Sequence, residues 1–514
     1  MNDNSIHVKR TATVLRPDQS RVLLRPFSPE DPQRAGRIIA RIMSLPENRV
    51  GPLLDEVSAE FSQRHQQIHK SFLERFEQVR DLLLTDDKIS DQRKLLIGSY
   101  FVCEFSLESA ALFNPSIVPH PDQSDLPPGA LRFILSLRAT GEGHISSITF
   151  RTGIIHVDHR IEVLPPTGFL TEPRQIPNPR YEKALFERKL FELGLTSGFT
   201  RRVMDKFGES FALEELRANL EAEVEQSRLS DRNAIRGILM LARSNYEVQF
   251  QPQQGLSERI IFPATPSQRN GIEDARFVCF QNDDGTLVYY ATFTAFDGKV
   301  VLPELVETSD FLLFRFITLN GPAAENKGMA MFPRKINGLY AMLSRQDNEN
   351  IYLMFSDNVH FWYERKVLLK PMFPWELVQL GNCGSPIETE AGWLVLSHGV
   401  GPLRTYCIGA FLLDHDNPGK VIGRLREPLL KPDQKERKGY VPNVVYTCGA
   451  LLHNGELIIP YGMADHATGF ATVPLDEVLA AMHSLCRKEI FLAQFPVCRP
   501  LIQEFLRGSG SRNR

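Results

Sequence analysis

The sequence predicts a mainly β protein with two added helical segments. Short apolar runs separated by turn residues recur from 246 to about 474, as antiparallel strands would produce. They group into units of roughly 50 residues, each with a polar loop and three or four strands, which favours the blades of a β-propeller. Periodicity alone leaves a β-sandwich open. Two stretches, 28–96 and 180–246, instead place apolar residues at helical spacing.

The chain of 514 residues is too long for one ordinary core, and five segments follow from the pattern. They are a helical N-terminal extension (1–96), a first blade (97–165), a helical insertion (166–245), the remaining blades (246–480) and a C-terminal helix and tail (481–514). The first strand is expected over 96–103. Because amphipathic faces must be buried, we expect the extension and the insertion to pack against each other beside the propeller. There they would cover the cavity mouth, form a subunit interface or only stabilise the fold.

Composition narrows the class of protein. A formal net charge of -3 gives no indication of a nucleic-acid or anionic-membrane partner. The first residues lack the apolar core of a signal peptide, and no apolar run approaches the ~20 residues of a membrane span. Seven cysteines without a CxxC pair predict neither a disulfide framework nor a metal site. We expect a cytoplasmic protein that binds neither nucleic acid nor membrane.

The most informative motif is Gly-Ile-Glu-Asp-Ala-Arg at 271–276, just before a strand-like run. Two carboxylates and a guanidinium are costly to bury unless they pair or do chemistry. A carboxylic acid that protonates a glycosidic oxygen needs a raised pKa and a fixed orientation, and neighbouring charges can supply both. An ion pair on an edge strand is the plainer explanation of these residues alone.

Four further polar motifs lie between predicted strands, and each has an ordinary structural explanation when taken alone. They are 113–116 with Arg138 and 141–147; 326–338 with Arg345; 384–389 with His398; and 440–446 with 461–465. In a propeller, loops at strand ends can converge on one central cavity. Their joint presence therefore indicates a site built from several blades.

In this order the motifs resemble glycoside hydrolase family 130, the β-mannoside phosphorylases and β-1,2-mannosidases. They are Gly-Ile-Glu-Asp-x-Arg (271–276), Phe-Pro-x-Lys-Ile-Asn-Gly-x-Tyr (332–340), Ser-Asp-x-x-x-x-Trp (356–362), Pro-Ile-Glu-Thr-x-x-Gly-Trp (386–393) with His-Gly-Val (398–400), and Asn-Val-Val-Tyr (443–446) with Tyr-Gly-x-Ala-Asp (461–465). The resemblance covers roughly 97–165 and 246–480, and it implies a five-bladed β-propeller with a central active site. The helical segments lie outside this core, so the chain resembles a long variant.

The resemblance implies an inverting reaction on a β-mannoside oligosaccharide, with Asp274 as proton donor acting through a sugar hydroxyl. In a phosphorylase, inorganic phosphate is the co-substrate and α-mannose 1-phosphate the product, and no cofactor is implied. A hydrolase would need a carboxylate to activate water, for which Glu388 is the candidate. Phosphate needs fixed cationic donors, and the candidates are Arg138, His398, Lys327 and Arg345. The candidate substrate-binding residues are Asn114, Glu273, Arg276, Lys335, Asn337, Tyr461 and Asp465.

Two departures from the family pattern leave phosphorolysis and hydrolysis both open. Ala275 replaces a common proline, and Gln379 stands where a phosphate-binding lysine often precedes the glycine-rich turn. A propeller that only binds glycans is the alternative from another class. Asp274 between Glu273 and Arg276 argues against it, because a binding module needs no proton donor. A homo-oligomer is a further open possibility.

Overall fold

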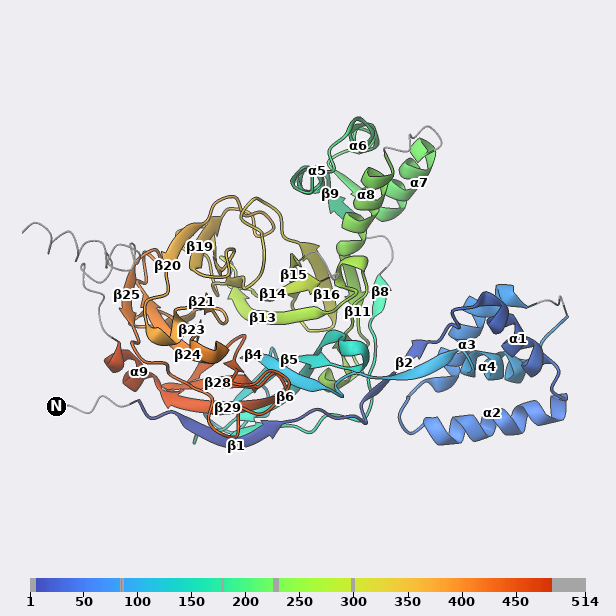
Figure 1. The fold of residues 1–514 in the computed structure, drawn as a ribbon, viewed down its shortest axis with the longest axis horizontal. Coiled ribbons are helices and arrows are strands. Elements are labelled where there is room, and N and C mark those ends of the chain that lie inside the picture. Colours follow the sequence, from blue (N-terminus) through green and yellow to red (C-terminus); the bar gives the residue numbers. More distant parts are fainter. Residues whose placement is uncertain are drawn as a thin grey trace, which may run out of the picture.

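The structure is a computed structural model that describes residues 6–83, 85, 87–176, 180–224, 231–296 and 301–482. Five antiparallel sheets of four to six strands form the body of the molecule, and two helical groups project from it (Figure 1). Within those residues no helix is both long and apolar enough to cross a membrane. The predicted mainly β class is confirmed.

The five sheets follow one another along the chain and are numbered here in that order. Sheet 1 contains β4 (Ala111–Pro119), β5 (Leu131–Thr140), β6 (Ser146–Ile155), β7 (Ile161–Val163) and β12 (Ile260–Ile261). Sheet 2 contains β8 (Arg174–Ile176), β11 (Tyr246–Gln249), β13 (Ile272–Gln281), β14 (Leu287–Phe296), β15 (Val301–Thr308) and β16 (Leu313–Thr318). Sheet 3 contains β17 (Ala330–Met331), β18 (Tyr340–Ser344), β19 (Ile351–Ser356) and β20 (Lys366–Leu369).

The last two sheets complete the body. Sheet 4 contains β21 (Gln379–Asn382), β22 (Ile387–Thr389), β23 (Gly392–Val400), β24 (Tyr406–Leu413) and β25 (Val421–Arg424). Sheet 5 contains β26 (Val445–Tyr446), β27 (Leu451–His453), β28 (Glu456–Met463), β29 (Ala467–Pro474) and, from the other end of the chain, β1 (Lys9–Leu15).

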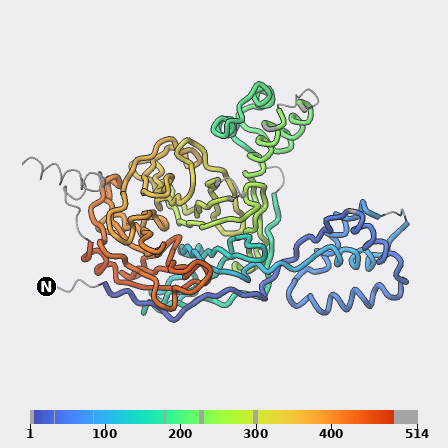
Figure 2. Tube along the Cα trace, viewed as in Figure 1, coloured from blue at the N-terminus to red at the C-terminus, as the bar shows by residue number. Residues whose placement is uncertain are grey.

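Each sheet shares a hydrophobic core with the next one, and sheet 5 shares a core with sheet 1. In sheet order, these contacts include Phe150 with Phe277, Phe280 with Tyr340, Phe332 with Trp393, Leu396 with Ile459, and Phe470 with Phe133. Apart from the partly buried Tyr340, these side chains are almost fully removed from water, which is the main stabilising term in such a fold. The sheets therefore close into a ring, the rounded body in Figure 2.

The N-terminal strand β1 closes the ring by pairing with β29 near the C-terminus, from Lys9 opposite Thr472 to Leu15 opposite Thr468. The expectation of a wholly helical extension over 1–96 is therefore wrong for its first part. A strand that joins both ends of the chain in one sheet covers an edge that would otherwise stay unpaired.

The N-terminal helical group stands on the antiparallel pair of β2 (Val22–Pro26) and β3 (Val102–Ser106). It contains α1 (Pro32–Met43), α2 (Glu47–Phe61), α3 (Ile68–Val79), the short helix η1 (Arg80–Leu82) and α4 (Asp91–Ser99), packed around their own core. The strand expected over 96–103 is wrong at its start. Leu96 and Ile97 belong to α4, because both are fully buried in that helical core.

The insertion is a second helical group with its own core. It contains α5 (Lys183–Glu192), α6 (Gly198–Met204), α7 (Leu213–Val224) and α8 (Arg232–Ser244), with a small sheet of β9 (Arg180–Glu182) and β10 (Ser210–Ala212). Figures 1 and 2 both show it apart from α1–α4, so the expected packing of the two groups against each other is wrong. Each group buries its apolar faces internally instead.

The insertion is anchored to sheet 2 and the loop after it. Lys189 Nζ donates to the carbonyl oxygen of Leu319 at 2.8 Å, and Glu192 Oε1 accepts from the Gly321 N–H at 2.7 Å. Strand β8 before the insertion pairs with β11 after it, which brings the two ends of the insertion together. At the other end of the chain, α9 (Leu475–Ala481) follows β29, while the rest of the expected C-terminal helix and tail, 483–514, lies outside the described residues.

Candidate active site

Two β-bulges, one in β4 and one in β13, create the centre of the site. The pairing register shifts between Phe113 and Ser116 in β4 and between Glu273 and Arg276 in β13. Within the bulges, Asn114 has φ 47° and Asp274 has φ 53°, a left-handed conformation that Asn and Asp tolerate better than most residues. A bulge re-aims a side chain. Here Asn114 Nδ2 donates to Asp274 Oδ1 at 2.7 Å.

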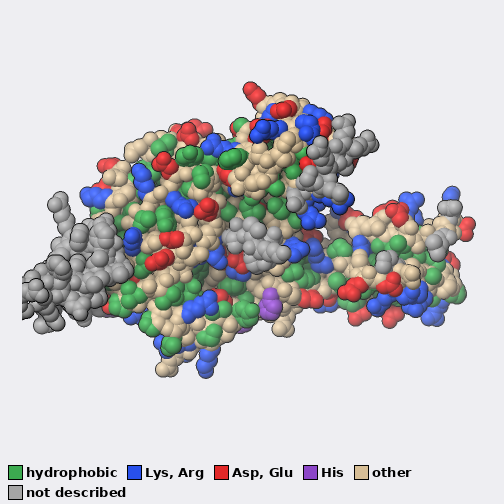
Figure 3. Space-filling model, turned by 45° about the horizontal axis from the view of Figure 1, so that its top comes forward, with side chains coloured by type: hydrophobic (Ala, Val, Ile, Leu, Met, Phe, Trp, Pro, Cys, Tyr) green, Lys and Arg blue, Asp and Glu red, His purple; other side chains and the backbone are tan. Residues whose placement is uncertain are grey.

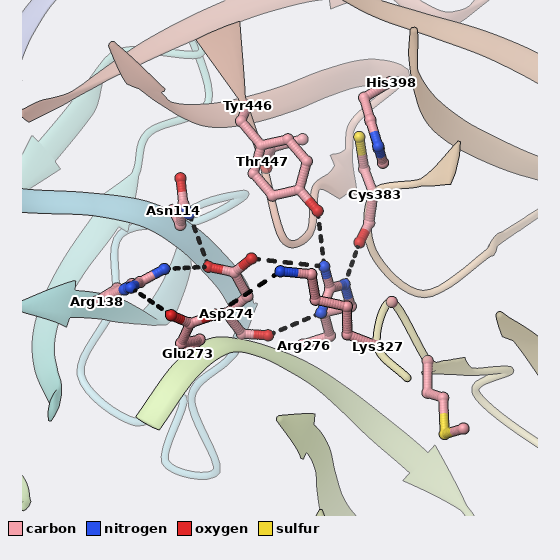
Figure 4. A network of polar contacts seen from close by, with 12 residues as sticks. Asn114, Arg138, Glu273, Asp274, Arg276, Lys327, Cys383, His398, Tyr446 and Thr447 are labelled. Atoms are coloured by element: carbon pink, nitrogen blue, oxygen red, sulfur yellow. Dashed lines mark hydrogen bonds and ion pairs between the residues drawn. The ribbon is translucent and has the colours of Figure 1, made fainter. Parts of the chain in front are cut away.

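Two arginines and a lysine surround the carboxylates (Figure 4). The Arg138 guanidinium lies 2.8 Å from Glu273 Oε1 and 3.4 Å from Asp274 Oδ1. Its Nε donates to Ser146 Oγ at 2.9 Å, which fixes the direction of the guanidinium. Lys327 Nζ lies 3.9 Å from Glu273 Oε2. The charges of the motif at 271–276 are therefore paired. The partners are Arg138 from sheet 1 and Lys327 from the loop before β17.

Arg276 ties three sheets together below the carboxylates. Its side chain is 1% exposed, and its Nη2 lies 3.9 Å from Asp274 Oδ2. It donates to the carbonyl oxygen of Cys383 after β21 at 2.7 Å and to the Tyr446 hydroxyl in β26 at 2.6 Å. Sequence reasoning missed Tyr446 as a site residue, although it ends the Asn-Val-Val-Tyr motif. Its pairing with Arg276 could not be read from the spacing of the motifs.

The environment separates the pKa values of two neighbouring carboxyl groups. Burial alone would raise the pKa of Asp274, but the charges of Arg138 and Arg276 and the hydrogen bond from Asn114 hold it at about 2. Burial and the negative charge of Asp274 raise the pKa of Asp465 to about 6. Asp274 is therefore ionised near neutral pH, contrary to the raised pKa expected of it. Of the two carboxyl groups, Asp465 takes up a proton at a higher pH than Asp274 does.

His398 lies beside the cluster as a neutral ring. It is fully buried, and burial together with the charges of Arg345 and Arg276 holds its pKa well below the ordinary range. Its Nε2 lies 3.1 Å from Arg345 Nη1, so it acts as acceptor to that arginine. The expectation of His398 as a cationic phosphate ligand is therefore wrong. Close packing requires Gly381 here, because a Cβ would lie 2.3 Å from the His398 ring.

The structure places Glu388 in a separate group of charges. Its carboxylate accepts from Arg334 Nη2 at 2.6 Å and lies 2.8 Å from His415 Nε2. The hydrogen bonds from Arg334 and His415 lower the pKa of Glu388 despite partial burial. No polar contact joins Glu388 to Asp274 within the described part of the chain. The expectation that Glu388 stands in the cluster as a base is wrong, because its carboxylate instead bonds to Arg334 and His415.

Three predicted substrate-binding residues also bond elsewhere. Lys335 pairs with Asp283 at 2.7 Å, Asn337 donates to the carbonyl oxygen of Asp416 at 3.3 Å, and Tyr461 donates to Glu436 at 2.6 Å. By contrast, Asn114, Glu273, Arg276 and Asp465 gather around Asp274, together with Arg138 and Lys327. The cluster thus unites the first motif with parts of the others.

Asp274 is thus held by arginines and an amide within a closed ring of sheets. Enzymes that act on glycosidic bonds use carboxyl groups held in a fixed orientation. The comparisons with known proteins agree with this class. A family model described as beta-1,4-mannooligosaccharide phosphorylase matches residues 228–484. The chain belongs to this family, glycoside hydrolase family 130, and is an enzyme. The long N-terminal region lies outside the matched residues.

Individual relatives carry related names. The chain is 35% identical over 231 residues to a 1,2-beta-oligomannan phosphorylase of Thermoanaerobacter sp., covering 43% of this chain and 75% of that one. It is 31% identical over 287 residues to a beta-1,2-mannobiose phosphorylase of Listeria innocua, covering 51% and 79%. A solved structure of a beta-1,2-mannobiose phosphorylase from Listeria innocua in complex with beta-1,2-mannobiose has a TM-score of 0.44 at 22% identity, covering 73% of this chain and 92% of that one.

Proposed function

We propose that this enzyme is an inverting phosphorylase of β-mannoside oligosaccharides that releases α-mannose 1-phosphate. The observation that carries the proposal is the cluster in which Asn114, Arg138 and Arg276 hold Asp274 between two bulged strands. The names of relatives at 31–36% identity, which are phosphorylases of β-1,2-linked mannosides, support this substrate class. We further propose that the ring of five sheets is a five-bladed β-propeller with the cluster at its centre.

Excess positive charge around the cluster supports an anionic co-substrate. Arg138, Arg276, Lys327 and Arg345 supply four cations within the network, against the three carboxyl groups of Glu273, Asp274 and Asp465. The buried Nε of Arg345 has no hydrogen-bond partner among the described residues. An unpartnered buried guanidinium N–H is costly, and a phosphate oxygen held there would satisfy it.

The ionised state of Asp274 has a consequence for the proton step. A phosphate dianion held by Arg345 and Lys327 would add negative charge beside Asp274 and raise its pKa, so that it can carry a proton. In the reaction, a phosphate oxygen forms a bond to the anomeric carbon while the bond to the leaving oxygen breaks. The leaving oxygen takes its proton from Asp274 through a sugar hydroxyl, and the phosphate hydroxyl returns a proton to Asp274. Inversion turns the β-mannoside into an α-phosphate.

The test is to incubate the enzyme with β-1,2-mannobiose and β-1,4-mannobiose, each with and without inorganic phosphate, and to quantify mannose 1-phosphate and free mannose. We expect mannose 1-phosphate only with phosphate present, and little free mannose without it. Release of free mannose at equal rates with and without phosphate would make the enzyme a hydrolase. No turnover of either disaccharide, with or without phosphate, would overturn the proposed substrate class.

We also propose a cytoplasmic location. The cysteines within the described residues, Cys103, Cys279, Cys383, Cys407 and Cys448, are all free thiols, which supports a reducing compartment. Fractionation of the cells that produce the protein, with detection by antibody, tests this proposal. Recovery in a secreted or membrane fraction would contradict it.

A further inference from the structure

A large cavity lies beside the cluster and not over it. It has a volume of about 800 Å³ and is bordered by β2, by the loop after β12 and by helices α7 and α8 of the insertion. Insertion and ring therefore enclose it together. In Figure 3, Lys and Arg side chains are visible near the place where the insertion meets the ring.

Four arginines line this cavity, one or more from each part of its wall. They are Arg25 in β2, Arg217 and Arg243 in the insertion, and Arg269 in the loop before β13. Two glutamates also line it, and each already has an arginine: Glu214 pairs with Arg217 at 3.2 Å, and Glu247 with Arg315 at 3.2 Å. The lining therefore carries more positive than negative charge.

Two of these arginines are available for a ligand. Arg243 and Arg269 form no ion pair or side-chain hydrogen bond with any residue that the structure describes. Arg25 is already held, by an ion pair with Glu172 and by its position 4.4 Å above the Phe262 ring. Both are exposed, and an arginine without a protein partner can bind two phosphate oxygens through its planar guanidinium group.

The cavity borders the reaction centre along the chain. Ile145 lines it, and the next residue, Ser146, accepts the hydrogen bond from Arg138. Arg269, which also lines the cavity, lies two residues before Gly271, where a Cβ would lie 3.0 Å from the Ser146 backbone nitrogen. A ligand here would therefore sit next to the residues that position Asp274.

We propose that this cavity is a second anion-binding site that takes the phosphate ester of a sugar. The free arginines bind the ester, and the apolar side chains of Ile145, Leu213 and Phe262 contact the sugar ring. Its volume lies within the usual range for organic ligands and is far larger than a phosphate ion needs. The insertion then has a role in recognition, since it supplies Arg217 and Arg243. This inference does not rest on the proposed reaction, because binding can be measured without turnover.

Calorimetric titration in phosphate-free buffer tests the site, with mannose 6-phosphate as probe and with mannose and inorganic phosphate as separate arms. We expect mannose 6-phosphate to bind wild type at least about tenfold more tightly than the R243Q/R269Q variant, because two charge-assisted contacts are lost. The matched control R201Q/R236Q removes two arginines of the insertion that do not line the cavity, and should bind like wild type.

Each outcome decides the proposal. Equal affinity of wild type and R243Q/R269Q for mannose 6-phosphate would overturn it. If R243Q/R269Q weakens binding of neutral mannose as much as binding of the ester, the cavity is a simple sugar site. If it weakens binding of inorganic phosphate as much, the cavity is a site for the free ion. Both outcomes contradict the proposal. Thermal midpoints of all variants establish that they are folded, and the single exchanges R243Q and R269Q replace the double one if its midpoint falls.

Discussion

At the residue scale, Asp274 is distinguished by a side chain that is nearly buried and held by polar partners on both carboxylate oxygens. Its side chain is 12% exposed, with Asn114 and Arg138 on one oxygen and Arg276 near the other. A non-glycine residue in a left-handed conformation is held there only when its surroundings fix it, and such residues concentrate at functional sites. The sequence shows the charge cluster, but the bulge that turns Asp274 toward Asn114 has no local sequence signal beyond the residue types themselves.

We predict that Asp274→Asn lowers turnover of a β-mannoside by about 10²–10⁴-fold, because the amide keeps the shape but cannot supply a proton. The measurement is kcat with saturating phosphate, together with a thermal unfolding curve to verify the fold. Asp416→Asn is the matched control, since the side chain of Asp416 is fully exposed on a remote loop. An Asp274→Asn variant that keeps more than about half of the wild-type rate would remove Asp274 from the proton step.

A second residue-scale prediction concerns pH and Asp465. Because folding raises the pKa of Asp465 from 3.8 to about 6, the folded protein holds this proton more tightly than the unfolded chain. The resulting stabilisation is fully present below the unfolded pKa and is lost as pH rises through about 6. Asp274, with a pKa of about 2, does not titrate in this window.

The Asp465→Asn variant lacks this contribution. The free energy of unfolding of wild type relative to the variant should therefore fall by about 1 kcal/mol between about pH 5 and about pH 7. Urea denaturation at both pH values measures it. Glu304, whose pKa burial raises to about 7, titrates in both proteins and cancels in the difference. A pH-independent difference would show that Asp465 does not bind a proton in this range.

At the element scale, helices and strands are predicted best where the periodic pattern of apolar residues extends over many residues. The helices of 28–96 and most strands after 246 follow from periodicity. The run at Leu96 is compatible with a strand because a short apolar run suits either element, and only packing against α3 decides for helix. Partners such as Arg334 for Glu388 could not be predicted, since they come from a neighbouring sheet.

The anchor of the insertion allows a prediction of stability. Lys189→Met should lower the free energy of unfolding by about 1–3 kcal/mol, because Glu192 and the Leu319 carbonyl both lose a buried donor. Lys206→Met is the matched control in the same insertion. Lys206 pairs with Glu223 at 2.9 Å but is 37% exposed, so its loss should cost less than about 1 kcal/mol. Urea denaturation compares the two, and equal costs would contradict the anchoring role.

At the scale of the whole molecule, ring closure by β1 is the feature that the sequence did not predict. A seven-residue strand near the N-terminus, Lys9–Leu15, pairs through both of its ends with Ala467–Pro474 at the other end of the chain, and no local pattern encodes such a long-range partner. Arg10 reinforces the closure through Glu436, at 2.8 Å, which also accepts from Tyr461. The closure explains why Tyr461, which was expected to bind substrate, instead bonds to Glu436 beside β1.

Removal of residues 1–15 should therefore lower the thermal midpoint and promote self-association, because the edge of β29 becomes unpaired. Scanning fluorimetry and size-exclusion chromatography measure these effects, with a chain that begins at residue 6 as control. A shortened chain that melts at the wild-type temperature and elutes as wild type does would show that β1 is dispensable.

In the proposed reaction, the cluster around Asp274 transfers a mannosyl group to phosphate with inversion. The most direct measurement is phosphorus and proton NMR of β-1,2-mannobiose with inorganic phosphate, followed in real time with wild type and with Asp274→Asn. We expect wild type to form α-mannose 1-phosphate and free mannose in equal amounts from the start, and the variant to form both at least about 10²-fold more slowly. A β-phosphate, release of two free mannoses per disaccharide without a phosphate ester, or an unimpaired variant would contradict this mechanism.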